Sequence, residues 1–131
     1  MMEKHMADAA AQCLQDSLSG AKHFGQIVAA LQEAGIESYF ADYRGACTTY
    51  YAGGQSLALP LPMPEQEIAD RFDAAAVQEA IRGAQRGEVK YPRFKQLTMA
   101  AGCIGYMTWI AGRHVAYFGR RGEVHVERFP S

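Results

Sequence analysis

The chain has 131 residues, of which 49% are hydrophobic and 21% are charged, an ordinary composition for a globular protein. Its formal net charge is −1, so no overall field attracts it to nucleic acid or to an anionic membrane. No apolar run approaches the length of a membrane span and the first residues lack the pattern of a signal peptide, so we expect no membrane contact.

The first half of the chain predicts two helices followed by three strands. A helix before Gly20 has a weak apolar stripe, and a helix over residues 23–34 has a stronger one. After the Ala-Gly pair at 34–35 the apolar period changes to two, which is typical of strands. The predicted strands cover residues 36–43, 47–51 and 56–59.

The second half predicts the same order of elements. A proline-rich linker at residues 60–64 comes first, followed by a short bridging helix at about 65–72. Asp73 suits the N-cap of a helix, and Pro92 suits the first turn of the next one. The predicted helices cover residues 74–86 and 92–101, and the predicted strands cover residues 103–110, 114–118 and 123–128.

A shift of 67 residues, without gaps, aligns the two halves. The identical pairs are Ala7/Ala74, Ala9/Ala76, Gly20/Gly87, Ala34/Ala101, Gly35/Gly102, Tyr39/Tyr106, Gly45/Gly112 and Tyr50/Tyr117. We therefore expect an α+β fold made by internal duplication of a helix-helix-strand-strand-strand unit, with antiparallel meander sheets covered by helices. We expect one compact domain over residues 1–131, with repeat 1 at about 7–59, the linker and short helix at 60–72, and repeat 2 at about 73–131.

The predicted strands at 36–43 and 103–110 are not cleanly polar on either side. We therefore expect both faces of the sheet to be partly covered, by helices on one side and by the other half or a partner on the other. A small apolar ligand pocket between the halves is one interpretation of this pattern, and ordinary core packing is the other.

Charge is distributed unevenly along the chain. Residues 1–73 hold ten acidic and four basic side chains, whereas residues 74–131 hold four acidic and nine basic ones. The basic half can face the acidic half of the same chain, or that of a second chain in a homodimer. Assembly of the second kind would weaken with added salt.

Arginine and aromatic side chains of the second half form the candidate binding surface. They are Arg82, Arg86, Trp109, Arg113, Tyr117, Arg120 and Arg121. Such a set suits a phosphate, a single-stranded nucleic acid or an acidic protein patch. Charged hairpin turns are also what any soluble sheet carries, and nucleic acid is not the favoured partner.

No motif for catalysis, a cofactor or a metal is present, since the chain lacks phosphate loops, HExxH and paired zinc-ligand spacings. The 67-residue shift places Cys47 opposite His114, and packing of equivalent positions could create a reactive pair. The alternative is that Cys47 is a small, half-buried strand residue. The three cysteines form no CxxC pair and point to reduced thiols in the cytoplasm.

Several runs of the second half carry a family resemblance. They are residues 72–77, 80–81, 85–88, 91–92 with Phe94, 122–127, and 129–130. These runs resemble a family of uncharacterised bacterial and prophage proteins, the YdfO-like and YbcV-like proteins, which are often labelled phage envelope protein. The first half departs from this pattern at Gly25, which stands where the second half has Pro92. The resemblance implies a compact α+β fold and no known activity.

The sequence thus favours an uncharacterised phage- or prophage-associated accessory protein that acts through protein–protein contact or self-association and needs no catalysis. The alternative function is a small-molecule or nucleic-acid binding module that uses the arginine-rich second half. An enzyme based on Cys47 and His114 is the third interpretation.

Overall fold

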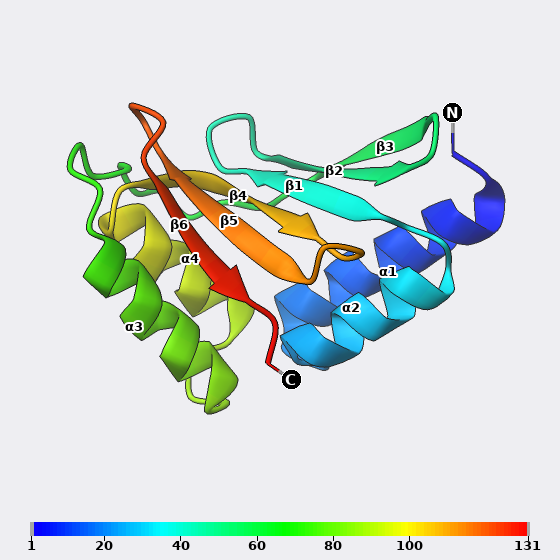
Figure 1. Cartoon of the computed structure of the whole chain (residues 1–131), viewed down its shortest axis with the longest axis horizontal. Coiled ribbons are helices and arrows are strands. Elements are labelled where there is room, and N and C mark those ends of the chain that lie inside the picture. Colours follow the sequence, from blue (N-terminus) through cyan, green and yellow to red (C-terminus); the bar gives the residue numbers. More distant parts are fainter. Residues whose placement is uncertain (1, 131) are drawn as a thin grey trace.

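The computed structural model describes residues 2–130. The chain forms two helices and three strands and then repeats that order, so the two halves lie side by side (Figure 1). The first half holds α1 (Lys4–Ser19), α2 (Phe24–Glu33), β1 (Ser38–Asp42), β2 (Cys47–Ala52) and β3 (Gln55–Pro60). The second half holds α3 (Ala74–Gln85), α4 (Tyr91–Ala100), β4 (Cys103–Trp109), β5 (His114–Gly119) and β6 (Val124–Arg128).

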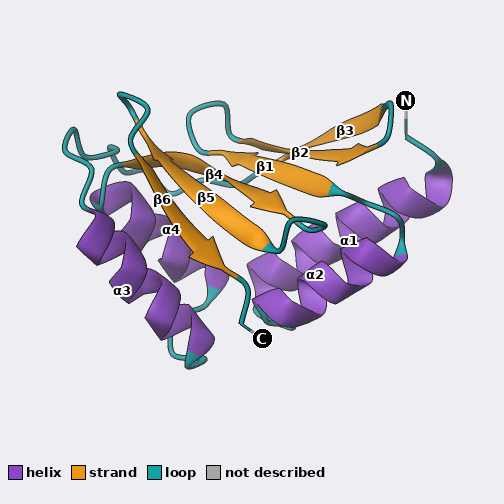
Figure 2. Cartoon of the chain, in the orientation of Figure 1, coloured by secondary structure: helices purple, strands orange, loops and turns teal. Residues whose placement is uncertain are grey.

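All six strands form one antiparallel sheet in the order β3-β2-β1-β4-β5-β6. The two meanders therefore join edge to edge through β1 and β4. The four helices lie on one face of the sheet as two hairpins, α1 with α2 and α3 with α4 (Figure 2). This arrangement confirms the predicted α+β class and the antiparallel meanders covered by helices.

The seam between β1 and β4 has a symmetric register. Phe40 pairs with Met107, which is its equivalent 67 residues later in the chain. The other pairs run in opposite directions from this centre: Tyr39 with Thr108, Ala41 with Tyr106, Ser38 with Trp109 and Asp42 with Gly105. Such a register relates the two halves by an approximate twofold rotation, which supports the interpretation of the chain as a repeated unit.

The expectation that the other half covers the second face of the sheet is wrong. Because the halves join edge to edge, neither can lie over the other. Trp109 and Val126 point to this second face and are 42% and 52% exposed. The face opposite the helices is therefore open in this chain.

Side chains that bond free backbone N–H groups cap the starts of α2 and α3. The Asp73 carboxylate accepts a hydrogen bond from the Ala76 N–H at 3.0 Å, where α3 begins. His23 and Gln26 form a reciprocal capping box at the start of α2. Within residues 2–130, no helix has the length and apolar character to cross a membrane.

The short helix predicted at about 65–72 is absent, and this prediction is wrong. Residues 61–73 form an irregular segment that lies against α4. The Ala69 N–H donates to the Met99 carbonyl at 3.0 Å, and the Asp73 N–H donates to the Ala101 carbonyl at 2.8 Å. An isolated helix of about eight residues is marginal in water, so these bonds to the end of α4 outweigh the local preference.

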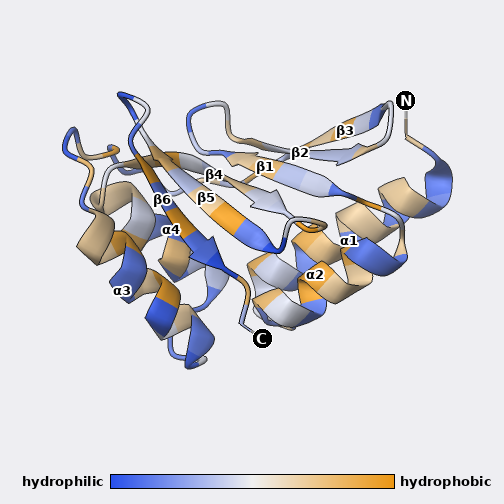
Figure 3. Cartoon of the chain, viewed as in Figure 1, coloured by the Kyte–Doolittle hydropathy of each residue, from blue (hydrophilic) through white to orange (hydrophobic). Residues whose placement is uncertain are grey.

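The core lies between the sheet and the helices. Each helix carries both apolar and polar residues (Figure 3), and the apolar side packs towards the sheet. Leu31 of α2, Val77 of α3 and Ile110 after β4 are almost completely buried. Each such side chain contributes about 1.5–3 kcal/mol to stability, so packing on the sheet outweighs the intrinsic helix propensities.

Candidate functional site

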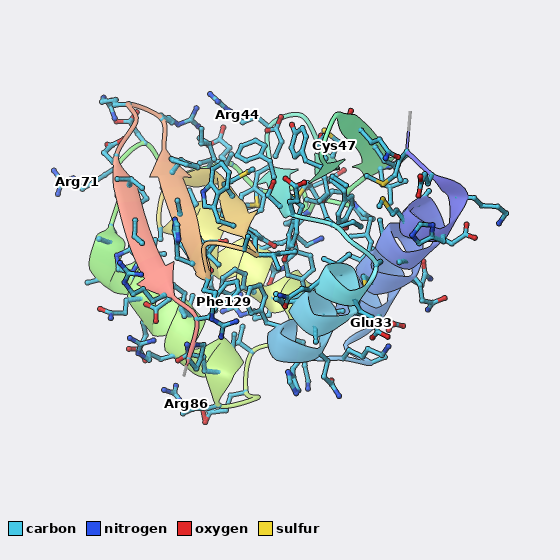
Figure 4. The ribbon with its side chains drawn as sticks, turned by 45° about the vertical axis from the view of Figure 1, so that its right-hand side comes forward. Glu33, Arg44, Cys47, Arg71, Arg86 and Phe129 are labelled. Carbon is cyan, nitrogen blue, oxygen red and sulfur yellow. The ribbon has the colours of Figure 1, made fainter. Side chains whose placement is uncertain are left out.

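A cavity of about 420 Å³ lies under the sheet, between the two helix hairpins. Both halves of the chain line it. The sheet forms the roof, α1 and α2 form one wall, and α3 and α4 form the other (Figure 1). Phe129 lies between the hairpins at the open end, beyond the last strand (Figure 4).

The cavity follows from the way the hairpins pack. Each hairpin packs chiefly within itself, and the contact between the two hairpins is confined mainly to α1 and α4. The sheet above is six strands wide and twists, so helices that follow their own strands diverge from each other. Small residues at the gap, Gly20, Ala84 and Gly87, leave the space between the walls unfilled.

Four tyrosines form an aromatic roof over the cavity: Tyr39, Tyr50, Tyr106 and Tyr117. The ring centroids of Tyr39 and Tyr50 are 5.4 Å apart, as are those of Tyr106 and Tyr117. The two pairs meet where Tyr39 contacts Tyr106 edge to face at 6.3 Å. The roof is therefore a continuous row of rings across β2, β1, β4 and β5, and it presents large apolar area at low entropic cost.

The tyrosine hydroxyls are neutral donors and acceptors at physiological pH. Burial raises the pKa of Tyr39 to about 12 and raises the pKa of Tyr106 and Tyr117 well above the usual value. The Tyr106 hydroxyl donates to the Tyr91 hydroxyl at 2.8 Å. That bond uses the Tyr106 hydrogen, so Tyr91 keeps its own hydrogen to donate. These tyrosines can thus hydrogen-bond a ligand while staying uncharged.

Thr48 provides an unpartnered polar atom in the lining. Its side chain is 2% exposed and lies on the cavity side of β2. Among residues 2–130, its Oγ1 has no hydrogen-bond partner. Leaving a buried hydroxyl unpaired costs about 1–3 kcal/mol, and a ligand that pairs with it would recover part of that cost.

The mouth of the cavity combines aromatic and basic side chains. Phe24 packs edge to face on Phe129, with centroids 5.5 Å apart, and is 40% exposed. Lys22 and Lys90 also lie at the cavity, and Lys22 forms an ion pair with Asp16 at 3.3 Å. The mouth therefore suits the polar or anionic end of a molecule whose apolar part lies under the tyrosine roof.

A second hollow of about 460 Å³ lies beneath the irregular segment 61–73. Its lining includes Arg44, Glu67 and Arg120. It is more open and more polar than the tyrosine-lined cavity. Binding pockets are enclosed and mostly apolar with a few polar groups, so the tyrosine-lined cavity is the better candidate.

The predicted arginines of α3 are engaged within the chain. Arg82 forms an ion pair with Glu127 at 2.8 Å, beneath β6. Arg86, at the end of α3 (Figure 4), pairs with Glu88 at 2.7 Å. These pairs offset much of the positive charge that the sequence places on this helix.

The structure separates the other predicted binding residues. Arg120 donates to the Ile68 carbonyl at 2.8 Å, and Arg121 pairs with Asp70 at 3.0 Å, so both hold the segment 61–73. Arg113 lies at the opposite end of β5, with its guanidinium over the Phe129 ring. Trp109 lies on the open face of the sheet and Tyr117 lies in the cavity roof. The seven predicted residues do not form one surface.

Cys47 and His114 do not meet. Cys47 lies at the start of β2 and His114 at the start of β5, with β1 and β4 between these strands. Three strand spacings amount to about 14 Å, too far for a hydrogen bond. Cys47 is a partly buried strand residue, and Cys13 and Cys103 are buried free thiols. Within residues 2–130, no group of three His, Cys, Asp or Glu side chains could hold a metal.

Apart from Tyr117, the sequence interpretation left the cavity residues out of its candidate site, although one signal marked them. The roof consists of Tyr39/Tyr106 and Tyr50/Tyr117, which are two of the identical pairs in the 67-residue repeat. Matching tyrosines on strands of both halves indicated a shared aromatic layer. The cavity beneath this layer exists because the two helix hairpins lie apart. No local sequence pattern shows the distance between the hairpins.

A family model described as "Protein of unknown function (DUF1398)" matches residues 19–128. No curated protein matches the chain. The matched residues include α2, all six strands, the segment 61–73 and both helices of the second half. The chain therefore belongs to the DUF1398 family, a family of unknown function.

Proposed function

We propose that the protein binds a small, mainly apolar molecule in the tyrosine-lined cavity. The observation that carries this proposal is a cavity of about 420 Å³, open at one end, that is lined by both halves. Thr48 is among the lining residues, and its buried Oγ1 has no hydrogen-bond partner among residues 2–130. Ligand pockets typically have volumes of about 300–1,000 Å³ and mostly apolar walls with a few polar groups. The cavity fits this description.

The lining indicates the class of ligand. The tyrosine roof favours a flat aromatic ring or a compact aliphatic group, held by stacking and dispersion. Thr48 and Tyr91 offer hydrogen bonds to a hydroxyl or carbonyl group inside. Lys22 and Lys90 at the mouth favour a carboxylate, sulfonate or phosphate at the outer end. An aromatic or short-chain acid combines these features.

Anilinonaphthalene sulfonate, an aromatic sulfonate whose fluorescence rises in apolar surroundings, tests this proposal. Ala84 lines the cavity from α3, so Ala84→Phe should fill the space and weaken binding at least tenfold. Ala75 is exposed on the same helix, and Ala75→Phe should bind like the wild type. Circular dichroism checks that both variants are folded. Equal binding by the two variants would place the dye elsewhere and count against the cavity.

Protein–protein contact is the second candidate function, favoured by the open apolar face of the sheet. Trp109, Val124 and Val126 are exposed there, and soluble monomers rarely show a large contiguous apolar patch. The association with phage or prophage implied by the sequence resemblance belongs to this proposal. It concerns a surface that the cavity does not share, so both functions can coexist in one chain.

A further inference from the structure

The face of the sheet opposite the helices is the main apolar surface of the chain. Among residues 2–130, the exposed large hydrophobic side chains are Phe24, Tyr51, Trp109, Val124 and Val126. Phe24 lies at the cavity mouth, whereas the other four lie on this open face. In Figure 3, β5 and β6 carry hydrophobic residues in their middle parts.

The strand register arranges the open face in three rows. The middle row consists of Ala58, Thr49, Phe40, Met107, Ala116 and Val126, from β3 to β6. None of these side chains is charged. One outer row consists of Pro60, Cys47, Asp42, Gly105, Phe118 and Val124, and the other of Ser56, Tyr51, Ser38, Trp109, His114 and Arg128. The acidic and basic side chains of these two rows are Asp42 and Arg128. A sheet face that is exposed to solvent normally carries many polar and charged residues. This face carries few charges, so it is suited to being covered.

We propose that the open face binds the same face of a second copy of this chain and forms a twofold symmetric dimer. This proposal concerns the other side of the sheet and does not rest on ligand binding in the cavity. Two sheets that pack face to face interdigitate their side chains into one layer about 10 Å thick. Phe40, Met107 and Phe118 would lie at the centre of that layer.

The size of the face fits a reversible dimer. Six strands that are about 4.8 Å apart and five residues long cover a flat outline of roughly 24 by 17 Å, or about 400 Å². This outline leaves out the extra surface of protruding side chains. Specific interfaces bury about 600–1,000 Å² on each partner. The exposed ring of Trp109 adds area beyond the flat outline, whereas Tyr51 on β2 lies outside the contact that the twofold axis described below creates. The contact is therefore small for a specific interface, and we expect a weak dimer that dissociates on dilution, not an obligate one.

The two charges of the face complement each other under the proposed symmetry. Asp42 lies on β1 in one outer row, and Arg128 lies three strands away on β6 in the other outer row. The midpoint between them falls at the pair of Met107 and Ala116. A twofold axis set diagonally through this point brings Asp42 of each copy to Arg128 of the other.

Asp42 can make this contact. Its Oδ1 accepts hydrogen bonds from the Arg44 and Gly45 N–H groups at 3.1 and 3.0 Å. Those bonds close the turn between β1 and β2, so Oδ2 can accept from a second copy. The net charge of −1 means that two copies do not repel each other strongly. A second copy would thus cover exposed apolar side chains such as Trp109 and Val126 and pair both charges.

Trp109 is the single tryptophan of the chain and lies within the proposed interface, so its fluorescence reports the contact directly. Sedimentation over a protein concentration series should show a monomer–dimer equilibrium. Over the same series, the Trp109 emission should move to shorter wavelength as the ring leaves water. A monomer at all concentrations would overturn the proposal. So would a dimer without an emission shift, because pairing of the free β3 or β6 edges would leave Trp109 exposed.

Variants locate the contact. Val126→Lys puts a charge in the middle row at an exposed edge-strand position that tolerates lysine, and should weaken dimerisation at least tenfold. Val124→Lys provides a second, independent change on the same face. Ala75→Lys adds the same charge on the helix side and should dimerise like the wild type. Circular dichroism establishes that each monomer is folded. Wild-type dimerisation by both valine variants would refute the proposed face.

Discussion

At the scale of single residues, Thr48 links stability to the proposed function. Its hydroxyl is buried beside the cavity and has no hydrogen-bond partner in the part of the chain that the structure describes. A residue selected only for packing at such a strand position would be valine, which has the same shape. The retained hydroxyl is therefore a cost in the free protein that makes sense if a ligand completes the bond.

Thr48→Val should stabilise the ligand-free protein by about 1 kcal/mol, because a methyl group replaces an unsatisfied buried hydroxyl. Urea unfolding of the purified variant measures this change. Thr49 lies next in the chain on the open face, so Thr49→Val is the matched control and should change stability by less than about 0.5 kcal/mol. A destabilised Thr48→Val would show that the hydroxyl has a partner in the free protein.

Residue-scale features divide into those the sequence predicts and those it does not. Asp73 predicted the start of α3, and its carboxylate does accept the Ala76 N–H. Ala46 and Arg113 both adopt left-handed backbone angles, with φ of 52° and 56°. These positions are 67 residues apart, yet neither is the glycine that such angles favour. Residue type therefore does not mark the left-handed positions themselves, although the identical pair Gly45/Gly112 next to them does mark the two turns.

At the scale of elements, the segment 61–73 shows how an irregular stretch can be fixed by its neighbours. Lys95 is 3% exposed and donates from Nζ to the Pro62 carbonyl. Burial lowers the pKa of this lysine, so the carbonyl contact compensates a buried ammonium group. Leu61 is 2% exposed and anchors the segment in the core. The segment is irregular in conformation but packed like a structural element.

Gly102, which follows α4, packs directly against the backbone of this segment. Its φ of +88° disfavours a side chain, and a Cβ there would also collide with the Arg71 backbone. Gly122 has a similar φ of +83° but no heavy atom within 4 Å of its Cβ position. The two glycines therefore separate the cost of backbone angle from the cost of packing.

Gly122→Ala should destabilise the protein by about 1–2 kcal/mol through the backbone angle alone. Gly102→Ala should cost at least about 2 kcal/mol more, because the segment must move away from α4. Thermal or urea unfolding of both variants measures the difference. Equal losses would mean that the segment shifts freely and is not fixed by this contact.

Local signals explain why the elements were predictable and the segment was not. Apolar periodicity, caps and glycine stops act within a few residues, and they placed all four helices and six strands close to their observed bounds. The helix expected at 65–72 rested on local composition too. Its backbone groups instead bond to residues near 100, about 30 positions away, and such contacts leave no local pattern.

At the scale of the whole molecule, the buried tyrosines make the fold sensitive to alkali. Burial raises the pKa of Tyr39 to about 12, and it raises the pKa of Tyr43, Tyr106 and Tyr117 in the same direction. Between pH 10 and 12 the unfolded chain releases these protons and the folded chain keeps them. The free energy of unfolding therefore falls as pH rises, by up to about 1.4 kcal/mol per pH unit for each such tyrosine.

The protein should thus unfold cooperatively above pH 10. Below pH 10 these tyrosines are protonated in the folded and the unfolded chain alike, so they do not change the free energy of unfolding there. Tyrosinate absorbance near 295 nm and far-ultraviolet circular dichroism, followed together, should change in one coincident step. A gradual rise of absorbance with the sheet signal intact would contradict the prediction, since it would mean that the cavity tyrosines ionise in the folded state.

The arrangement of the two halves lay beyond the sequence. The charge split suggested that the halves attract each other, and Arg121 with Asp70 is one such pair. The predicted strand at 114–118 already separated Arg113 from Arg120, but the sequence could not place Cys47 and His114 three strands apart, because that separation depends on the strand order. The candidate site follows from the same order, since it forms only where two hairpins share one sheet.

The symmetric seam of β1 and β4 has a consequence for how the protein folds. Within each half the strands connect through short turns, so both meanders can form early through local contacts. The seam joins positions about 67 residues apart and closes the longest loop, which makes it the late step. The cavity roof is continuous only after that step. A ligand in the cavity should therefore slow the opening of the seam more than the fraying of either meander. Amide hydrogen exchange at Tyr43 and Ile110, whose N–H groups donate across the seam to the Ile104 and Glu37 carbonyls, would register its presence.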